Sequence, residues 1–120
     1  MNEISISASL AASKGGVSET QATSKTIDMV GEDMLGGTQT INVAVTLVST
    51  GDIAVPARYI QIKNIDATNF VELACDANFA AVSIFAKLLP ADVALLPPKQ
   101  NIYARADTAV CKISKTAVEA

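Results

Sequence analysis

The sequence has no histidine, no tryptophan, two cysteines, two tyrosines and three phenylalanines. Without histidine it lacks the commonest general base and the commonest metal ligand. Ser-His-Asp and Cys-His arrangements are therefore excluded, and two cysteines alone cannot complete a tetrahedral zinc site. The Gly15-Gly16 and Gly36-Gly37 pairs do not match phosphate-binding spacings. We therefore predict no enzymatic activity, no catalytic, cofactor-binding or metal-ligating residues, and no cofactor.

Charge is also scarce, at 18% of residues with a net charge of −3. This balance argues against a nucleic-acid partner, which requires a basic surface to displace phosphate counterions. The longest uncharged run, residues 34–51, contains polar residues and glycine throughout, so it is not expected to span a membrane. Half of the residues are nevertheless hydrophobic. In a small chain that composition leaves apolar surface to bury against copies of itself or a partner, and we expect a homo-oligomer.

Two groups of carboxylates could carry chemistry. The densest group is Asp28, Glu32 and Asp33, which lacks the alternating ligand positions of a calcium loop and is expected to be a solvated loop. The second is Glu72 with Asp66 and Asp76 near the ends of its predicted strand, and a glycosidase needs two converging carboxylates. So few aromatic rings would supply a poor sugar-stacking platform, and we do not expect this activity.

The cysteines, Cys75 and Cys111, each lie among apolar residues of a predicted strand. The N-terminal segment has an acidic Glu3 and strict alternation, unlike a secretory signal, so synthesis in the cytosol is expected. Both cysteines are then predicted to be buried reduced thiols. A disulfide between them is the alternative if their strands pair.

Alternation of apolar and polar residues predicts an all-β fold, because no segment has the 3.6-residue period of a helix. Strands are predicted over residues 3–10, 38–48, 58–63, 70–75, 82–88, 93–96, 102–106 and 109–114. The central stretch, residues 58–75, is predicted to be a hairpin with a turn at 66–69, its inward rows formed by Ile60 and Ile62 and by Val71, Leu73 and Cys75. Strands 8–12 residues apart are typical of a sandwich or barrel. We expect a single-domain antiparallel β-sandwich or jelly-roll-like barrel of about eight short strands.

One domain is predicted over residues 1–120, with residues 17–37 as an arm or long loop. Residues 3–10 have the clearest half-buried strand pattern, whereas residues 17–29 are polar and rich in Thr and Ser. Such a polar segment has no buried row of its own, and it either pairs as an exposed edge strand or extends away as an arm. We expect it to pair across subunits or lie on a partner. Residues 115–120 are expected to form a loose tail.

Four of the five aromatic residues occupy the face opposite the aliphatic row of their predicted strands. They are Tyr59, Phe70, Phe85 and Tyr103. These rings either fill local gaps and cover sheet edges, or they anchor a subunit contact, where aromatic residues are enriched. The pattern leaves both alternatives open.

Several segments resemble a group of small β-rich virion structural proteins of tailed bacteriophages. The segments are ISISASLAASKGG, GGTQTI, YIQIKNIDATNFVEL, LPADVALLP and IYARADTAVCKI. The resemblance implies a structural component of the particle and supplies no functional residues. The expected role is a capsid decoration (cement) protein on the capsid surface of the virion, trimeric and bound outside the lattice of the major capsid protein. The alternative is a neck, tail or fibre-associated subunit, including a receptor- or carbohydrate-binding module, which the short Ala-rich connections disfavour.

Overall fold

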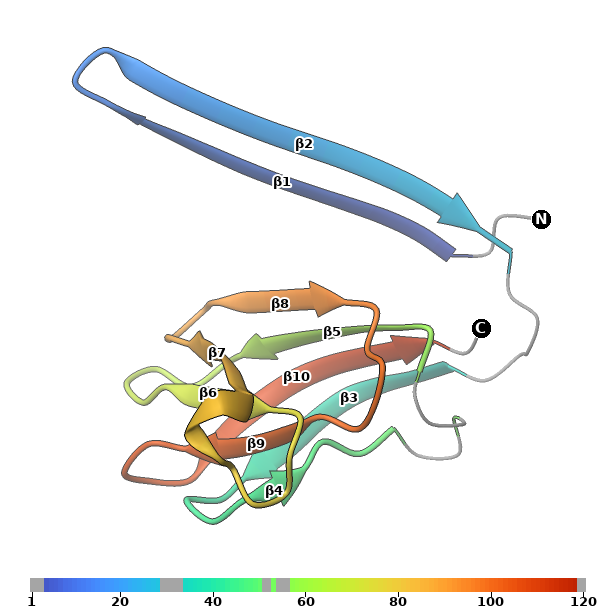
Figure 1. Cartoon of the computed structure of the whole chain (residues 1–120), viewed down its shortest axis with the longest axis vertical. Coiled ribbons are helices and arrows are strands. Elements are labelled where there is room, and N and C mark those ends of the chain that lie inside the picture. The colour runs from blue at the N-terminus through green and yellow to red at the C-terminus, as the bar shows by residue number, and fades with distance from the viewer. Residues whose placement is uncertain (1–3, 29–33, 51–52, 54–56, 119–120) are drawn as a thin grey trace. The chain divides into compact units, whose positions relative to one another are not determined.

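Ten β-strands and one 3-10 turn make up the computed structural model, which describes residues 4–28, 34–50, 53 and 57–118 (Figure 1). The elements are β1 (Ile4–Lys14), β2 (Val17–Ile27), β3 (Met34–Ile41), β4 (Thr46–Leu47), β5 (Tyr59–Asn64), β6 (Val71–Ala74), η1 (Ala81–Ser83), β7 (Ile84–Leu88), β8 (Val93–Leu96), β9 (Tyr103–Ala106) and β10 (Cys111–Val118). The described residues contain no α-helix, so the predicted all-β class is confirmed. The chain divides into two compact units, residues 1–31 and 32–120.

The first unit is an antiparallel hairpin in which β1 pairs with β2 along its whole length, from Ile4 opposite Ile27 to Lys14 opposite Val17. Its two-residue turn is Gly15-Gly16, whose φ angles of 59° and 83° are those of the type I′ turn that suits a twisted hairpin. The predicted strand over residues 3–10 is present as β1, but its half-buried row is only partly confirmed: Ile4 is buried and Ile6 half-buried, whereas every side chain from residue 7 to residue 26 is exposed. The alternation is real, but the hairpin contains no second layer to cover it.

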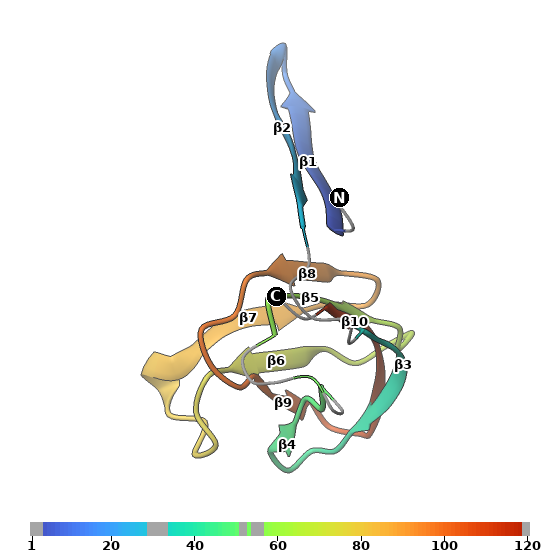
Figure 2. The same cartoon turned by 90° about the vertical axis from the view of Figure 1, so that its right-hand side faces the viewer.

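The second unit is a sandwich of two four-stranded sheets, ordered β3-β10-β5-β8 and β4-β9-β6-β7 (Figure 2). Four antiparallel pairs are nested along the chain: β3 with β10, β4 with β9, β5 with β8 and β6 with β7. The chain therefore runs as one long two-stranded ribbon folded over itself, held by the pairs β10–β5 and β6–β9. This is the strand order of a jelly roll, and the predicted sandwich of about eight short strands is confirmed.

A single hydrophobic core lies between the two sheets. Its largest fully buried members are Ile41, Ile62, Leu73, Ile113 and Val71. All core residues fall between Ile41 and Ala117, so the hairpin contributes none of them. The core cluster of the jelly-roll unit is therefore formed without the hairpin, whose one buried side chain among the described residues is Ile4.

The predicted hairpin over residues 58–75 is wrong in its pairing, although its inward rows are correct except for Cys75. β5 and β6 belong to different sheets, and Ile60, Ile62, Val71 and Leu73 all face the core. The turn residues make a crossover instead: the Asn64 side chain accepts a hydrogen bond from the Asp66 amide at 2.9 Å and donates to the carbonyls of Asn69 and Leu88. These bonds fix a corner between the two sheets.

Three further predictions are corrected by the structure. The predicted strand over residues 38–48 breaks at 42–45, where the chain crosses from β3 to β4 and leaves Val43 and Val45 exposed. The predicted strand over 82–88 begins only at Ile84, because Val82 lies in the 3-10 turn and is 98% exposed. The predicted loose tail is ordered as far as Val118, since residues 115–118 complete β10 between β3 and β5.

The segment predicted as an arm or long loop, residues 17–37, is not one element. Residues 17–27 form β2, and residues 34–37 begin β3. Its middle part, residues 29–33, lies outside the described residues. The polar Thr- and Ser-rich pattern is therefore that of a strand, paired along one edge by β1.

Candidate functional site

The carboxylates that could have formed a catalytic pair are each held by other groups. Glu72 accepts a hydrogen bond from Arg105 at 3.0 Å. Asp66 accepts from the backbone amides of Asn69 and Thr68, and these bonds lower the pKa of its carboxyl group. Asp76 accepts from the Asn78 amide at 3.0 Å. Asp66 and Asp76 therefore act locally as turn-forming side chains.

The acidic group Asp28, Glu32 and Asp33 lies mostly outside the described residues, which include only Asp28. Among the residues that the structure describes, no cluster of three or more His, Cys, Asp or Glu side chains could hold a metal ion. Nor does this part of the chain contain a helix long and apolar enough to cross a membrane.

The two cysteines are free, and they differ in exposure. Cys111 lies in the core at 1% exposure, and burial raises the pKa of its thiol. Cys75 is half-buried, contrary to its predicted inward position. The reason is a register shift between Leu73 and Ala74 in the β6–β7 pairing, which places Ala74 in the core and rotates the next residue outward.

Cations cover three of the five aromatic rings. Lys87 lies 4.2 Å above the ring of Phe70, Arg105 lies 4.5 Å above Phe79, and Arg58 lies 4.6 Å above Tyr59. The sequence left open whether these rings fill gaps and cover sheet edges or anchor a subunit contact. The cation contacts favour the first role, since a ring covered by its own chain offers less surface to another subunit. Phe85 differs, because it stands on β7 with 48% of its surface exposed.

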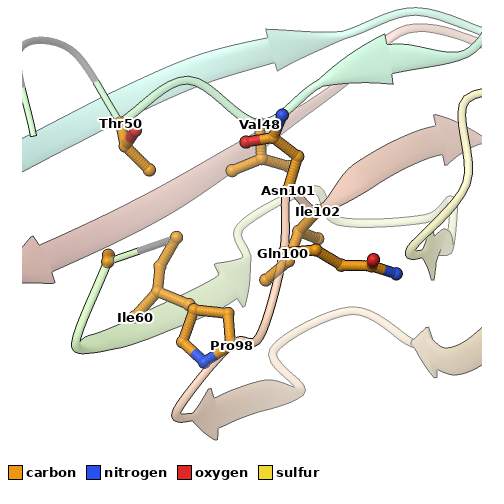
Figure 3. A pocket seen from close by; sticks show the side chains of 8 residues that line it. Val48, Thr50, Ile60, Pro98, Gln100, Asn101 and Ile102 are labelled. Carbon is orange, nitrogen blue, oxygen red and sulfur yellow. The ribbon is translucent and has the colours of Figure 1, made fainter. Parts of the chain in front are cut away.

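A small cavity lies at the end of the sandwich where β5 meets the β8–β9 connection (Figure 3). Val48, Ile60, Pro98 and Ile102 are among its lining side chains, and the amide of Gln100 points away from them. That amide donates to the Cys75 carbonyl at 3.1 Å. The free volume is about 10 Å³, which is the space of one water molecule at most. The cavity is a packing defect and not a ligand site.

A larger open groove of about 490 Å³ lies on the outer side of the same connection. It is lined by Cys75, Phe85 and residues 96–102, with Pro97, Pro98 and Leu96 supplying apolar walls. The volume falls within the range of small-molecule sites. Lys99, Gln100 and Asn101 add polar groups, so the lining combines apolar walls with polar side chains.

Sequence reasoning missed a buried lysine, because its strand was predicted to end at residue 114. Lys115 points into the sandwich from β10 with 6% exposure. Its ammonium group donates to Gln39 Oε1 and to the Ser49 carbonyl, each at 2.5 Å. Gln39 in turn donates to the Leu47 carbonyl at 2.7 Å. This network joins β3, β4 and β10, and burial lowers the pKa of Lys115.

The hairpin presents an extended exposed surface. We define the small-residue face as the side chains that the β1–β2 register places on one side of the ribbon: Ser5, Ser7, Ser9, Ala11, Ser13, Ser18, Thr20, Ala22, Ser24 and Thr26. The opposite face combines Ile6 and Leu10 of β1 with Glu19, Gln21 and Lys25 of β2. Leu10 is 75% exposed. A two-stranded hairpin alone is only marginally stable in water.

Comparisons with known proteins add no identity to this geometry, since no protein-family model, curated protein or solved structure matches the chain.

Proposed function

We propose that the chain is a non-enzymatic structural protein of a tailed-bacteriophage virion, a capsid decoration protein that forms trimers on the outside of the major capsid protein lattice and stabilises it. The sequence resemblance supports the virion, and the jelly roll supports it at the level of the fold, because this architecture is frequent in viral capsid and lectin domains. Fold alone does not carry a function.

The observation that carries the proposal is the exposed hairpin. Twenty-two residues form β1 and β2, and every side chain between residues 7 and 26 is exposed. A ribbon of this kind gains stability by adding backbone hydrogen bonds and side-chain contacts from another chain. A protein that exposes such a ribbon in addition to a self-sufficient jelly roll is suited to assembly.

The test uses particle shells assembled from the major capsid protein alone. The full chain should bind these shells in co-sedimentation and raise the temperature at which they disassemble. A variant in which a short Gly-Ser linker replaces residues 7–26 should keep the melting temperature of the jelly-roll unit, because all of these residues are exposed and none belongs to the core, but it should bind the shells weakly. Equal binding by both forms would remove the hairpin from the proposal. No binding by the full chain would reject the decoration role.

The second candidate is a receptor- or carbohydrate-binding subunit of the neck, tail or fibre. The specific observation in its favour is the groove beside Phe85, where a half-exposed ring adjoins the polar side chains of Gln100 and Asn101. An exposed ring with polar neighbours can stack on a sugar. Binding of the full chain to a purified glycan, lost in Phe85→Ala, together with no binding to shells, would favour this candidate.

A further inference from the structure

The sequence of β2 is nearly symmetric about its central residue, Ala22. Residues at equal distances on either side match in type: Gln21 with Thr23, Thr20 with Ser24, Glu19 with Lys25, Ser18 with Thr26, and Val17 with Ile27. The only charged pair in this set has opposite signs. A strand with this pattern is complementary to a second copy of itself running in the opposite direction.

The free edge of β2 can accept such a partner. In the described residues β2 pairs only with β1, as one edge of a two-stranded sheet. The Gly15-Gly16 turn makes Lys14 and Val17 the closing pair of the hairpin. Because hydrogen-bonded and non-hydrogen-bonded pairs alternate from that point, the even-numbered residues of β2 direct their N–H and C=O groups to the free edge.

The charges of β2 have no opposite charge directly across the hairpin. Glu19 lies opposite Ala12, with Lys14 only diagonal to it, and Lys25 lies opposite Ile6. Both side chains are exposed. The hairpin therefore gives neither charge a directly facing partner, whereas a second copy would.

We infer that two copies of the chain associate through their β2 strands, which pair antiparallel about a two-fold axis at Ala22 to form the four-stranded sheet β1-β2-β2-β1. Even-numbered residues then face even-numbered residues, as the free edge requires. Glu19 of each copy lies opposite Lys25 of the other, which gives two cross-strand ion pairs. Opposite charges that face each other across an antiparallel pair stabilise it, and like charges destabilise it.

The symmetry selects one register among those the backbone allows. A shift of two residues in one direction places Lys25 opposite Val17, and a shift in the other places Glu19 opposite Ile27. Either shift removes both ion pairs. A pairing of two β1 strands would not favour one register in this way. Lys14 is the one charged residue of β1, and the Ile/Ser alternation of this strand repeats every two residues, so shifted registers look alike.

This association is isologous, so it closes on two chains and does not by itself produce a filament. It is independent of the decoration role and compatible with it. In a trimer, each hairpin would join the trimer to a neighbour across a two-fold axis.

The first experiment places a thiol on the proposed axis of the full chain, in a Cys75→Ser background. Facing Cα atoms in an antiparallel pair lie about 5.5 Å apart, which suits a disulfide. Ala22→Cys should therefore form a disulfide-linked dimer in a glutathione redox buffer. Ala11→Cys is the matched control, since Ala11 is equally exposed on the same small-residue face but belongs to β1. Equal linkage of the two variants would overturn the inference.

The second experiment reverses charges within the Ala22→Cys protein. Glu19→Lys or Lys25→Glu alone should lower the equilibrium yield of linked dimer on the order of tenfold, because two attractive pairs become repulsive. The double variant, Glu19→Lys with Lys25→Glu, should restore the yield. Lys112→Glu makes the same change in net charge as Lys25→Glu, but Lys112 is an exposed residue of β10 and not of the hairpin, so this variant should leave the yield unchanged.

A mixture of the two single variants gives the sharpest outcome. The Glu19→Lys chain presents lysine at both charged positions of β2, and the Lys25→Glu chain presents glutamate at both. The mixture should therefore form heterodimers although each variant alone links poorly. Far-ultraviolet circular dichroism should confirm that each variant keeps the β-sheet spectrum. If the mixture links no better than the single variants, or if Lys25→Glu links as well as the parent, the two-fold pairing of β2 is wrong.

Discussion

The corner between β5 and β6 should depend on one buried side chain, Asn64. It is fully buried, and its amide nitrogen donates to the carbonyls of Asn69 and Leu88, each at 2.9 Å. Its oxygen accepts from the Asp66 amide at 2.9 Å. Asn64→Ala removes all three bonds and leaves a space that the backbone at this corner cannot close.

The expected loss follows from these bonds. Removing one partner of a buried hydrogen bond costs about 1–3 kcal/mol, so the loss of three bonds, partly compensated by water, should lower the free energy of unfolding by about 3 kcal/mol. In a domain of this size that corresponds to a decrease of roughly 15 °C in melting temperature. Urea denaturation followed by circular dichroism measures the free energy, and a thermal melt checks it.

Two further variants separate the hydrogen bonds from the change in size. Gln61→Ala alters an exposed residue of the same strand and should change stability by less than about 0.5 kcal/mol. Asn64→Asp keeps the shape but places a carboxylate against two carbonyl oxygens, so at neutral pH it should destabilise at least as strongly as Asn64→Ala. Its deficit should shrink as pH falls, because the protonated carboxyl group can donate one hydrogen bond. If Asn64→Ala resembles Gln61→Ala, the corner network does not stabilise the fold.

Three other predictions concern titratable side chains. Burial lowers the pKa of Lys115, so the unfolded chain binds this proton more tightly than the folded one. The free energy of unfolding should therefore rise with pH between the lowered pKa and the ordinary 10.5. In Lys115→Met this rise, measured by urea unfolding, should be absent. Cys75 should react with thiol reagents in the native protein and Cys111 only after unfolding, as peptide mass analysis would show. Arg105→Ala removes both the ion pair with Glu72 and the cation over Phe79, and it should cost about 1–2 kcal/mol in all; a loss above about 3 kcal/mol would contradict this.

The inward rows of the sandwich were predictable from the sequence, and the strand partners were not. Ile60, Ile62, Val71 and Leu73 alternate with other residues along their strands, and all four are buried. Alternation with period two indicates which face of a strand is buried, but it does not indicate which other strand pairs with it. The turn residues at 66–69 suit both a hairpin and a corner. The choice depends on Asn64, whose hydrogen bond to Leu88 joins residues 24 positions apart.

Two errors arose where residue type does not follow burial. The shift in pairing after Leu73 turns Cys75 outward, and a β-bulge leaves no clear mark in the residue types. Near the C-terminus, Lys115 occupies an inward position of β10. Because a lysine is charged, a prediction from residue type ends the apolar row before it. The strand continues because Gln39 and Ser49 supply oxygens for the ammonium group.

The hairpin of β1 and β2, which is the proposed assembly surface, was the least predictable part. Here the pattern is clear, but the burial it predicts is mostly missing. Residues 3–10 have a clear alternating row, which predicts a buried face, and Ile4 in that row is buried, yet Leu10 is 75% exposed. A period-two row of Ile and Leu has a physical use only where something covers it. The jelly-roll core is complete without this row, so its own fold does not require the hairpin. If the protein has the proposed role, the exposed part of this row is buried in an assembly and not within the chain. The same residues therefore mislead a prediction of the fold but support a prediction of association.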